Sequence, residues 1–272
     1  MREILFVVGL FVMGMALRSS RATVPRKIGA LLYLVVSFLA LYFATGRIWA
    51  GILGVLAWFF LPWLELLTRI RRMRLPIENR LRFRTPPDPA YYPDAEEAAA
   101  AMEEAGFEHV NDCGWEWDGM KQFFRLFWHP EERSVATVCL CEQSEVAFSF
   151  ISVTSRDENG RMWRTTNFPF SPTLAYPPKF RWRHVKCENR CFPKILHAHR
   201  EFLRHENVKH DDLAIPDPEC IEMEIEQEMR EHIKHNLDHG LIRPAGDGTF
   251  RYSGRGLVFL WKQYVRDMIR LC

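Results

Sequence analysis

Residues 28–67 read IGALLYLVVSFLALYFATGRIWAGILGVLAWFFLPWLELL, and this apolar stretch decides how the chain is organised. Its only charged residues are Arg47 and Glu65, and Thr45-Gly46-Arg47 is its one clear polar break. A hydrocarbon core of about 30 Å requires roughly 20 helical residues, so the arms 28–44 and 48–67 predict a transmembrane helical hairpin. The alternative, a buried hairpin of a soluble protein, fits less well because both arms are apolar on every face.

A shorter apolar run, residues 4–17, precedes the hairpin. Its 14 residues extend only about 21 Å as a helix, which is short of a full crossing. Three interpretations remain open: a short spanning helix, a segment lying in the membrane interface, and a signal peptide cleaved at Gly14-Met15-Ala16. The positive charges that follow, at Arg18, Arg21, Arg26 and Lys27, oppose cleavage because they resist translocation.

Positive charge collects on both sides of the hairpin. Residues 1–84 contain 13 Lys and Arg against 3 Asp and Glu, and residues 85–272 contain 23 against 31, so net charges of +10 and −8 combine to +2. Because Lys and Arg concentrate in the cytoplasmic flanks of membrane helices, both ends of the hairpin are expected in the cytoplasm. The sequence thus predicts a multi-pass protein of a bacterial-type inner membrane, with residues 85–272 cytoplasmic.

The stretch Thr68–Arg84, the basic collar, follows the hairpin with a net charge of +6. Each Lys or Arg near an anionic leaflet contributes about 1 kcal/mol, so the collar is expected to bind anionic inner-leaflet lipids. Nucleic acid is not the expected partner, because topology already explains these charges. A stiff linker with four prolines completes the segment 68–93. The expected membrane-surface contacts are Arg69, Arg71, Arg72, Arg74, Arg80, Arg82 and Arg84.

Residues 94–272 are expected to form an acidic cytoplasmic α+β domain. The chain is 48% hydrophobic and 26% charged with seven Cys, which excludes a disordered chain, collagen and a disulfide-stapled miniprotein. Short turns separate the strand-like runs, so neighbouring strands are antiparallel, and Asn159-Gly160 fits a type I′ turn. We predict a meander of four or five strands over about 107–168, from the runs 107–111, 122–129, 134–141, 146–155 and 161–168.

Apolar residues lie on both faces of this predicted sheet. Phe124, Leu126 and Trp128 share one face of their strand, and Phe123 and Phe127 share the other. Because a solvated face would alternate with polar residues, we expect helices on one face and a ligand, a partner protein or a second copy of the chain on the other. Residues 169–186, rich in Pro and aromatic residues, are expected as a long loop that covers the sheet or takes part in function.

Helical periodicity dominates residues 192–272, with helices expected at 192–203, 217–239 and 256–271. The glutamates of 217–239 crowd its first half, an order that the helix dipole explains. The segment between the last two helices contains Gly240-Leu241-Ile242 and a Gly/Asp hairpin, and over 20–30 residues it resembles the last helix and wing of winged-helix regulators. That resemblance implies a wing that touches DNA, although the Leu and Thr of the family's closing pattern are missing and the preceding acidic region opposes phosphate.

One group of residues is a candidate metal site: Cys187, Cys191 and His197, with His184 and His199 nearby in the sequence. Thiolate and imidazole are ligands that zinc prefers, although the two cysteines lack the C-x-x-C spacing of structural zinc sites.

Other chemical groups have simpler interpretations. Cys139 and Cys141 share a strand face and are interpreted as small core residues. The helix bearing His232, His235 and His239 lacks the glutamate of an H-E-x-x-H site, and the acidic residues around Trp115 are interpreted as a polar turn. The sequence contains no nucleophile elbow, Walker loop, dinucleotide fingerprint or kinase motif, and it identifies no cofactor.

Three functional hypotheses follow. The first is a membrane-anchored cytoplasmic interaction or ligand-sensing module without a catalytic constellation. The second is a metal- or thiol-dependent enzyme that uses the Cys187, Cys191 and His cluster. The third is a membrane-tethered regulator with a winged-helix-like C-terminus.

Overall fold

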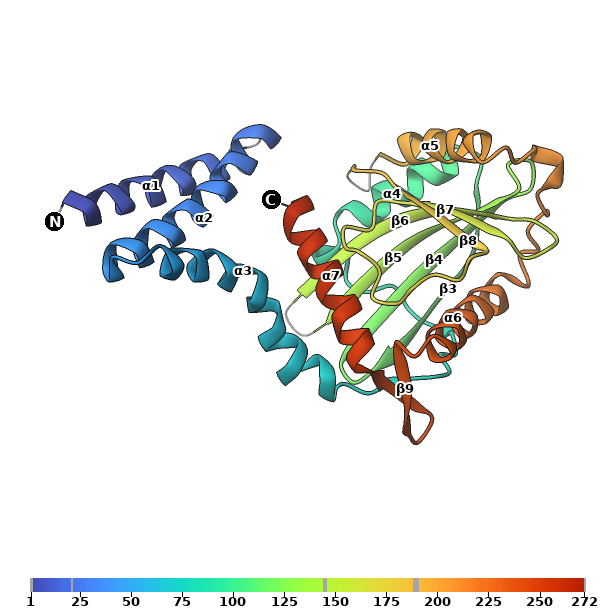
Figure 1. Ribbon diagram of the computed structural model, residues 1–272. Helices are drawn as coiled ribbons and strands as arrows, with labels where there is room; N and C mark the ends of the chain where they lie inside the picture. The colour runs from blue at the N-terminus through green and yellow to red at the C-terminus, as the bar shows by residue number, and fades with distance from the viewer. Residues whose placement is uncertain (1, 21, 144–145, 188–190, 272) are drawn as a thin grey trace. The chain divides into compact units, whose positions relative to one another are not determined.

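The computed structural model describes residues 2–20, 22–143, 146–187 and 191–271 (Figure 1). Two compact units make up the chain: residues 1–73 with 252–272, and residues 74–251. The helices are α1 (Arg2–Arg18), α2 (Thr23–Thr45), α3 (Ile48–Thr68), α4 (Asp94–Glu104), α5 (Phe192–His205), α6 (Ile221–Asp238) and α7 (Gly254–Leu271). The strands are β1 (Leu75–Pro76), β2 (Arg82–Phe83), β3 (Glu108–Trp117), β4 (Met120–His129), β5 (Ser134–Gln143), β6 (Val146–Arg156), β7 (Met162–Thr166), β8 (Phe180–His184), β9 (Ile242–Gly246) and β10 (Thr249–Tyr252).

The first unit contains the long apolar helices that the sequence predicts. Two helical segments, Val24–Thr45 and Ile48–Arg72, are long and apolar enough to cross a membrane by length and composition. Glycines lie where neighbouring helices touch: a Cβ on Gly29 would lie 2.7 Å from the carbonyl oxygen of Gly14, and one on Gly54 would lie 2.7 Å from that of Ser37. Small residues at such contacts are typical of helices that pack in lipid.

The C-terminal helix α7 packs on α3 within the same unit. The indole Nε1 of Trp261 donates a hydrogen bond to the carbonyl of Phe59 (2.7 Å), and the Trp261 ring stacks on Trp63 at 6.2 Å between centroids. α3 is bent (Figure 1) and contains Pro62, which has no N–H to continue the helical hydrogen-bond ladder. The terminal helix that the sequence predicts is therefore present, and it contacts an apolar helix of the N-terminal part.

The second unit is built on a seven-stranded sheet with the order β2-β3-β4-β5-β6-β7-β8. Strands β3 to β7 form a five-stranded antiparallel meander, which confirms the α+β class and the meander. The collar supplies β2 at one edge, and β8 pairs parallel to β7 at the other. β8 corrects the expectation of a loop over 169–186. The 13-residue connection after Thr166 is long enough for a parallel return.

The hairpin between β6 and β7 is confirmed, but the predicted type I′ turn is wrong. The Gly160 amide donates to the carbonyl of Asp157 (3.0 Å), and Gly160 alone in this turn has positive φ (+73°), so Asn159 does not adopt the left-handed conformation. Positive φ at two consecutive residues occurs instead at Asp118 (+46°) and Gly119 (+76°), between β3 and β4. That Asp-Gly pair therefore forms the I′-type connection.

Different helices cover the two faces of the sheet (Figure 1). α4 and α5 pack on one, the helix face, where Phe123, Val138, Ile151 and Val153 form an apolar core. α6 packs on the other, the cavity face, through contacts of Ile221 and Ile225 with Phe124, Leu126 and Cys139. The expectation of the domain's own helices on one face is met, and α6 covers only part of the other.

A second, three-stranded sheet has the order β1-β10-β9 and contains the hairpin expected between the last two helices. β1 belongs to the collar and pairs with β10, so the collar is built into both sheets: Leu75 opposes Phe250, and Arg82 opposes Gly114. The amide of Leu81 also donates to the Glu226 carboxylate of α6 (2.7 Å). The part of the collar after Met73 therefore folds with the domain.

Candidate functional site

Side chains on the cavity face form three rows that run across the strands. The first is apolar and pairs Phe124 with Cys139 and Cys139 with Phe150. The second consists of hydroxyls, since Thr137 opposes Ser152 and Ser152 opposes Thr166. The third pairs Thr154 with Arg164 and Arg164 with Trp182. Residues directly opposite each other point to the same face, so the surface changes from apolar to charged over three rows.

A cavity of about 290 Å³ lies between these rows and α6. α6 contributes Ile221, Ile225 and Met229 on the apolar side and Glu224 and Glu228 on the charged side. The volume equals that of about ten water molecules in the liquid and lies at the lower end of the range for small-molecule sites. The cavity therefore combines an apolar wall with a few polar groups, as such sites usually do.

Two hydroxyls on the cavity floor make no hydrogen bond to the described part of the protein. Thr137 and Ser152 are 9% and 6% exposed and both line the cavity. Among the described residues neither hydroxyl has a hydrogen-bond partner, whereas Thr166 of the same row donates to the carbonyl of Ile151 (2.9 Å). Neither oxygen is among the fully buried polar atoms without a partner, so both are accessible from the cavity. The pair is therefore a donor and acceptor site that faces the cavity.

An ion-pair network closes the charged side. Glu228 accepts hydrogen bonds from both terminal nitrogens of Arg164 (2.7 Å each) and from Arg156 (3.2 Å), and Glu224 lies 3.1 Å from Arg156. Burial raises the pKa of Glu228, but the charges and hydrogen bonds of Arg164 and then Arg156 outweigh it, and the pKa lies below its usual value. Each of these guanidinium groups thus has a carboxylate partner before any ligand binds.

The other titratable groups lining the cavity are held mostly in unreactive forms. Burial raises the pKa of Tyr176 to about 12 and raises that of the Cys139 thiol well above its usual value, so both stay protonated at neutral pH. Burial also raises the pKa of Glu224, and Arg156 offsets part of that effect. A protonated thiol is a weak nucleophile.

A serine–histidine contact occurs on the opposite face, away from the cavity. The His199 ring lies 3.1 Å from the Ser155 hydroxyl and 3.0 Å from that of Thr165. The three residues are at most 2% exposed, and burial lowers the pKa of His199 to about 3. Substrate has no access to this pair, which is a satisfied polar contact of the core.

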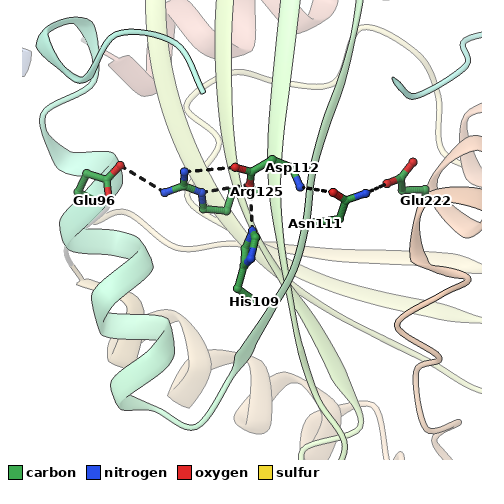
Figure 2. Close-up of polar contacts among 6 residues, drawn as sticks. All are labelled: Glu96, His109, Asn111, Asp112, Arg125 and Glu222. Atoms are coloured by element: carbon green, nitrogen blue, oxygen red, sulfur yellow. Dashed lines mark hydrogen bonds and ion pairs between the residues drawn. The ribbon is translucent and has the colours of Figure 1, made fainter. Parts of the chain in front are cut away.

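A second polar network links both covering helices to the edge of the sheet (Figure 2). Arg125 donates to Asp112 through Nε (3.1 Å) and also bonds Glu96 of α4, while His109 lies 3.1 Å from Asp112. On the other side, Asn111 bonds Glu222 of α6. Adjacent strand residues point to opposite faces, so Asn111 and Asp112 reach both helices, and the β-bulge between His109 and Asn111 places His109 on the same face as Asp112. The network therefore fixes α4 and α6 to β3.

The candidate metal residues lie apart from the cavity. Cys187 and Cys191 flank residues outside the described ranges, and His197 is exposed and lies 3.8 Å from Glu201. Within the described ranges, no three His, Cys, Asp or Glu side chains are close enough together to hold a metal ion. The Cys187, Cys191 and His197 set therefore stays a prediction from the sequence.

The cysteine pair and His232 pack against neighbouring side chains, although Nε2 of His232 is buried without a hydrogen-bond partner among the described residues. Cys139 and Cys141 do share a face, with their sulfurs 3.8 Å apart, and Cys139 accepts from Gln122. His232 packs between Tyr176 and Phe180, and burial lowers its pKa to about 4.

The structure divides the collar arginines between the two units. Arg69, Arg71 and Arg72 lie at and after the end of α3, and Arg74 begins the second unit. Arg80 lies near Glu78, Arg82 lies in β2, and Arg84 pairs with Glu116 (3.1 Å). The carboxylates near Trp115 therefore do not form one site, because Glu116 and Asp112 bind different arginines.

Sequence reasoning missed the residues of the cavity itself. The helix dipole accounts for the order of the glutamates of 217–239 in the sequence, yet Glu228 follows Ile221 and Ile225 on the buried stripe of α6. The available signal was that stripe, together with polar residues at every second position of 152–156 on a face that also carries Phe150. Comparisons with protein-family models, with curated proteins and with solved structures found no match to this chain.

Proposed function

We propose that this protein is a membrane-anchored module whose domain binds an uncharged amphiphilic molecule in the cavity between the sheet and α6. The observation that carries the proposal is the pair of hydroxyls of Thr137 and Ser152, which line an otherwise apolar and charge-compensated cavity and make no hydrogen bond within the described residues. Such a pair can donate to and accept from one hydroxyl, carbonyl or amide group of a ligand.

The apolar part of the ligand would lie on the phenylalanine side of the cavity. Phe124 and Phe150 provide its floor, Phe168 lies beside them, and Ile221 and Ile225 of α6 lie opposite. Burying apolar surface there contributes about 25 cal/mol per Å², which is enough to drive binding of a chain or ring of about ten heavy atoms.

Charge compensation favours an uncharged polar group. Arg164 and Arg156 are already neutralised by Glu228 and Glu224, so an incoming carboxylate would have to displace an existing partner. An incoming ammonium group would lie close to the positive charges of the same two arginines, which would repel it. A buried charge without a partner is costly, whereas a neutral oxygen requires only the two hydroxyls.

We propose binding without catalysis as the function of this cavity. Two observations support this. The pKa values of the Cys139 thiol and the Tyr176 phenol are raised, and the Glu228 carboxylate is bound by two arginines. The ligand-sensing hypothesis therefore has more physical support than the thiol-dependent enzyme.

The anchor is the second part of the proposal. The two long apolar helices and the surrounding excess of arginine support a multi-pass inner-membrane protein whose domain faces the cytoplasm. A reporter that works only outside the cytoplasm, fused after Cys272, is expected to give no signal. A strong signal would show that the orientation is reversed.

The ligand test uses the full chain in lipid nanodiscs, with octan-1-ol as the probe and octanoate as its charged counterpart. Hydrogen exchange of the α6 amides, followed by mass spectrometry, reports occupancy beneath that helix. We expect octan-1-ol to slow exchange in α6 and octanoate to require about tenfold higher concentration or more, because its charge finds no free partner.

A double variant tests the hydroxyl pair directly. Thr137→Val with Ser152→Ala removes two hydrogen-bonding groups worth about 1 kcal/mol each, so the response to octan-1-ol is expected to weaken about tenfold or more. The matched control is Thr173→Val, at an exposed threonine outside the cavity. A wild-type response in the double variant, or no response of α6 to octan-1-ol in the native chain, would contradict the proposal.

A further inference from the structure

The edge strand β2 exposes an aromatic side chain. Phe83 is 74% exposed, more than any other large hydrophobic residue in the described part of the chain. Leu81, two residues earlier, is only 8% exposed and packs in the core beneath α6. An exposed phenylalanine forgoes about 1.5–3 kcal/mol of burial, which a partner surface would recover.

Arginines lie beside this phenylalanine along the same edge. The Arg80 side chain is 77% exposed, and its one ion pair within the described ranges is a 3.9 Å contact with Glu78. Arg82 is exposed, and among the described residues it has no ion-pair partner. The simplest alternative explanation is that these charges block the edge strand from pairing with other sheets, and do nothing else.

The arginines also border a groove. Blocking of strand pairing does not require such a groove. A groove of about 390 Å³ is lined by Arg80, Arg82 and Arg84 together with Trp115 and Trp117. Its floor includes Gly114, where a Cβ would lie 3.0 Å from Cδ of Arg84, so the arginine stem crosses the strand over this glycine. Three arginines face Glu78 and Glu116 in the groove, which leaves it positive.

The length of the intervening chain limits the distance between the β2 edge and the end of the candidate membrane span. The candidate membrane span ends at Arg72, and Phe83 follows eleven residues later. An extended chain covers at most about 3.6 Å per residue, so Phe83 lies within about 40 Å of the end of that span. A membrane surface is therefore always within reach of this edge, if the span is embedded.

We propose that the β2 edge docks on an anionic lipid surface, with the Phe83 ring in the interfacial layer and Arg80 and Arg82 on lipid phosphates. This inference rests on the anchor part of the proposed function and is independent of the cavity. An aromatic ring beside guanidinium groups matches the apolar and anionic layers of a leaflet. A long nucleic acid fits less well, because residues 85–272 carry a net charge of −8.

The experiment places the photoreactive residue benzoylphenylalanine at position 83 of the full chain in nanodiscs. The matched control has the same residue at position 223, where Met223 of α6 is 59% exposed. Discs contain either phosphatidylglycerol with phosphatidylcholine or phosphatidylcholine alone, and mass spectrometry identifies what each position cross-links. We expect lipid adducts at position 83 in anionic discs, and few at position 223.

Arginine variants test the electrostatic part. Each arginine at an anionic surface changes occupancy about fivefold, so Arg80→Gln with Arg82→Gln is expected to reduce docking about 25-fold and remove most of the adduct. Equal lipid adducts at both positions, or an adduct that survives both arginine changes, would overturn the proposal. Cross-links from position 83 to a second copy of the chain would assign the edge to self-association instead. Extraction of the protein by alkaline carbonate would separately show that the anchor itself is wrong.

Discussion

The substitution Glu228→Gln tests whether the ion-pair network holds α6 on the sheet. The Glu228 side chain is 8% exposed and neutralises Arg164 and Arg156, whose side chains are 27% and 23% exposed. Glutamine keeps the size of the side chain and removes its charge. Arg156 then keeps its contact with Glu224, while Arg164 loses the carboxylate that it binds among the described residues.

The expected cost follows from burial. Removing one partner of a buried ion pair costs about 3–5 kcal/mol, and the quarter exposure of the arginines places this case near 3 kcal/mol. For a unit of this size, 1 kcal/mol lowers the midpoint of thermal unfolding by about 2–4 °C, so the variant is expected to melt about 6–12 °C lower. Thermal unfolding of the full chain in nanodiscs, followed by circular dichroism, measures this shift.

Two further variants make the result interpretable. Asp238→Asn breaks the exposed Lys234–Asp238 pair (2.7 Å) of the same helix, and its expected cost is only about 0.3–0.5 kcal/mol. Glu228→Met combined with Arg164→Met replaces the pair by apolar side chains and is expected to recover most of the lost stability. If Glu228→Gln costs no more than Asp238→Asn, the network does not hold α6 in place.

Three other predictions concern the domain. Burial lowers the pKa of His199 from 6.5 to about 3 and that of His232 from 6.5 to about 4. Just below pH 6.5 only the unfolded chain takes up these protons, so the free energy of unfolding is expected to fall by up to about 1.4 kcal/mol per pH unit for each histidine. Denaturation midpoints that do not change between pH 7 and pH 5 would contradict this. Gly114→Ala is expected to destabilise the β2 edge by about 2 kcal/mol or more, because its Cβ would lie 2.2 Å from the Gln122 carbonyl oxygen, and urea denaturation measures the loss. Cys187→Ser is expected to leave the metal content and midpoint of the purified protein unchanged, and loss of bound zinc in this variant, measured by mass spectrometry, would revive the metal-site hypothesis.

The sequence predicts the elements whose signals are local. Alternating residues over 122–129 and 134–141 identify β4 and β5 because each strand packs both of its faces, and helical periodicity identifies α5 and α6 in the same way. β8 was not predicted, although Phe180, Trp182 and His184 alternate with arginines. Its pairing with β7 depends on a return of the chain across 167–179, and prolines in that stretch indicate a loop.

The candidate site could not be predicted, because its parts meet only after folding. Glu228 is an ordinary helix glutamate until Arg164, 64 residues earlier, lies opposite it. Asn236 is similar: its side chain bonds both the amide and the carbonyl of Ala175, which fixes the long connection against α6. No local pattern in the sequence encodes these contacts or the space that they leave between helix and sheet.

The two faces of the one sheet allow packing to be separated from function. On the helix face, Phe123, Val138 and Ile151 show that these strands can be covered with apolar side chains alone. The cavity face instead carries ion pairs and two hydroxyls without a hydrogen bond to the described part of the protein, and apolar residues of similar volume would replace them at no cost or with a gain in stability. The double variant Thr137→Val with Ser152→Ala is therefore expected to keep or raise the unfolding midpoint while it weakens the response to octan-1-ol. If stability falls together with binding, the hydroxyls serve the fold, and the cavity is a packing defect.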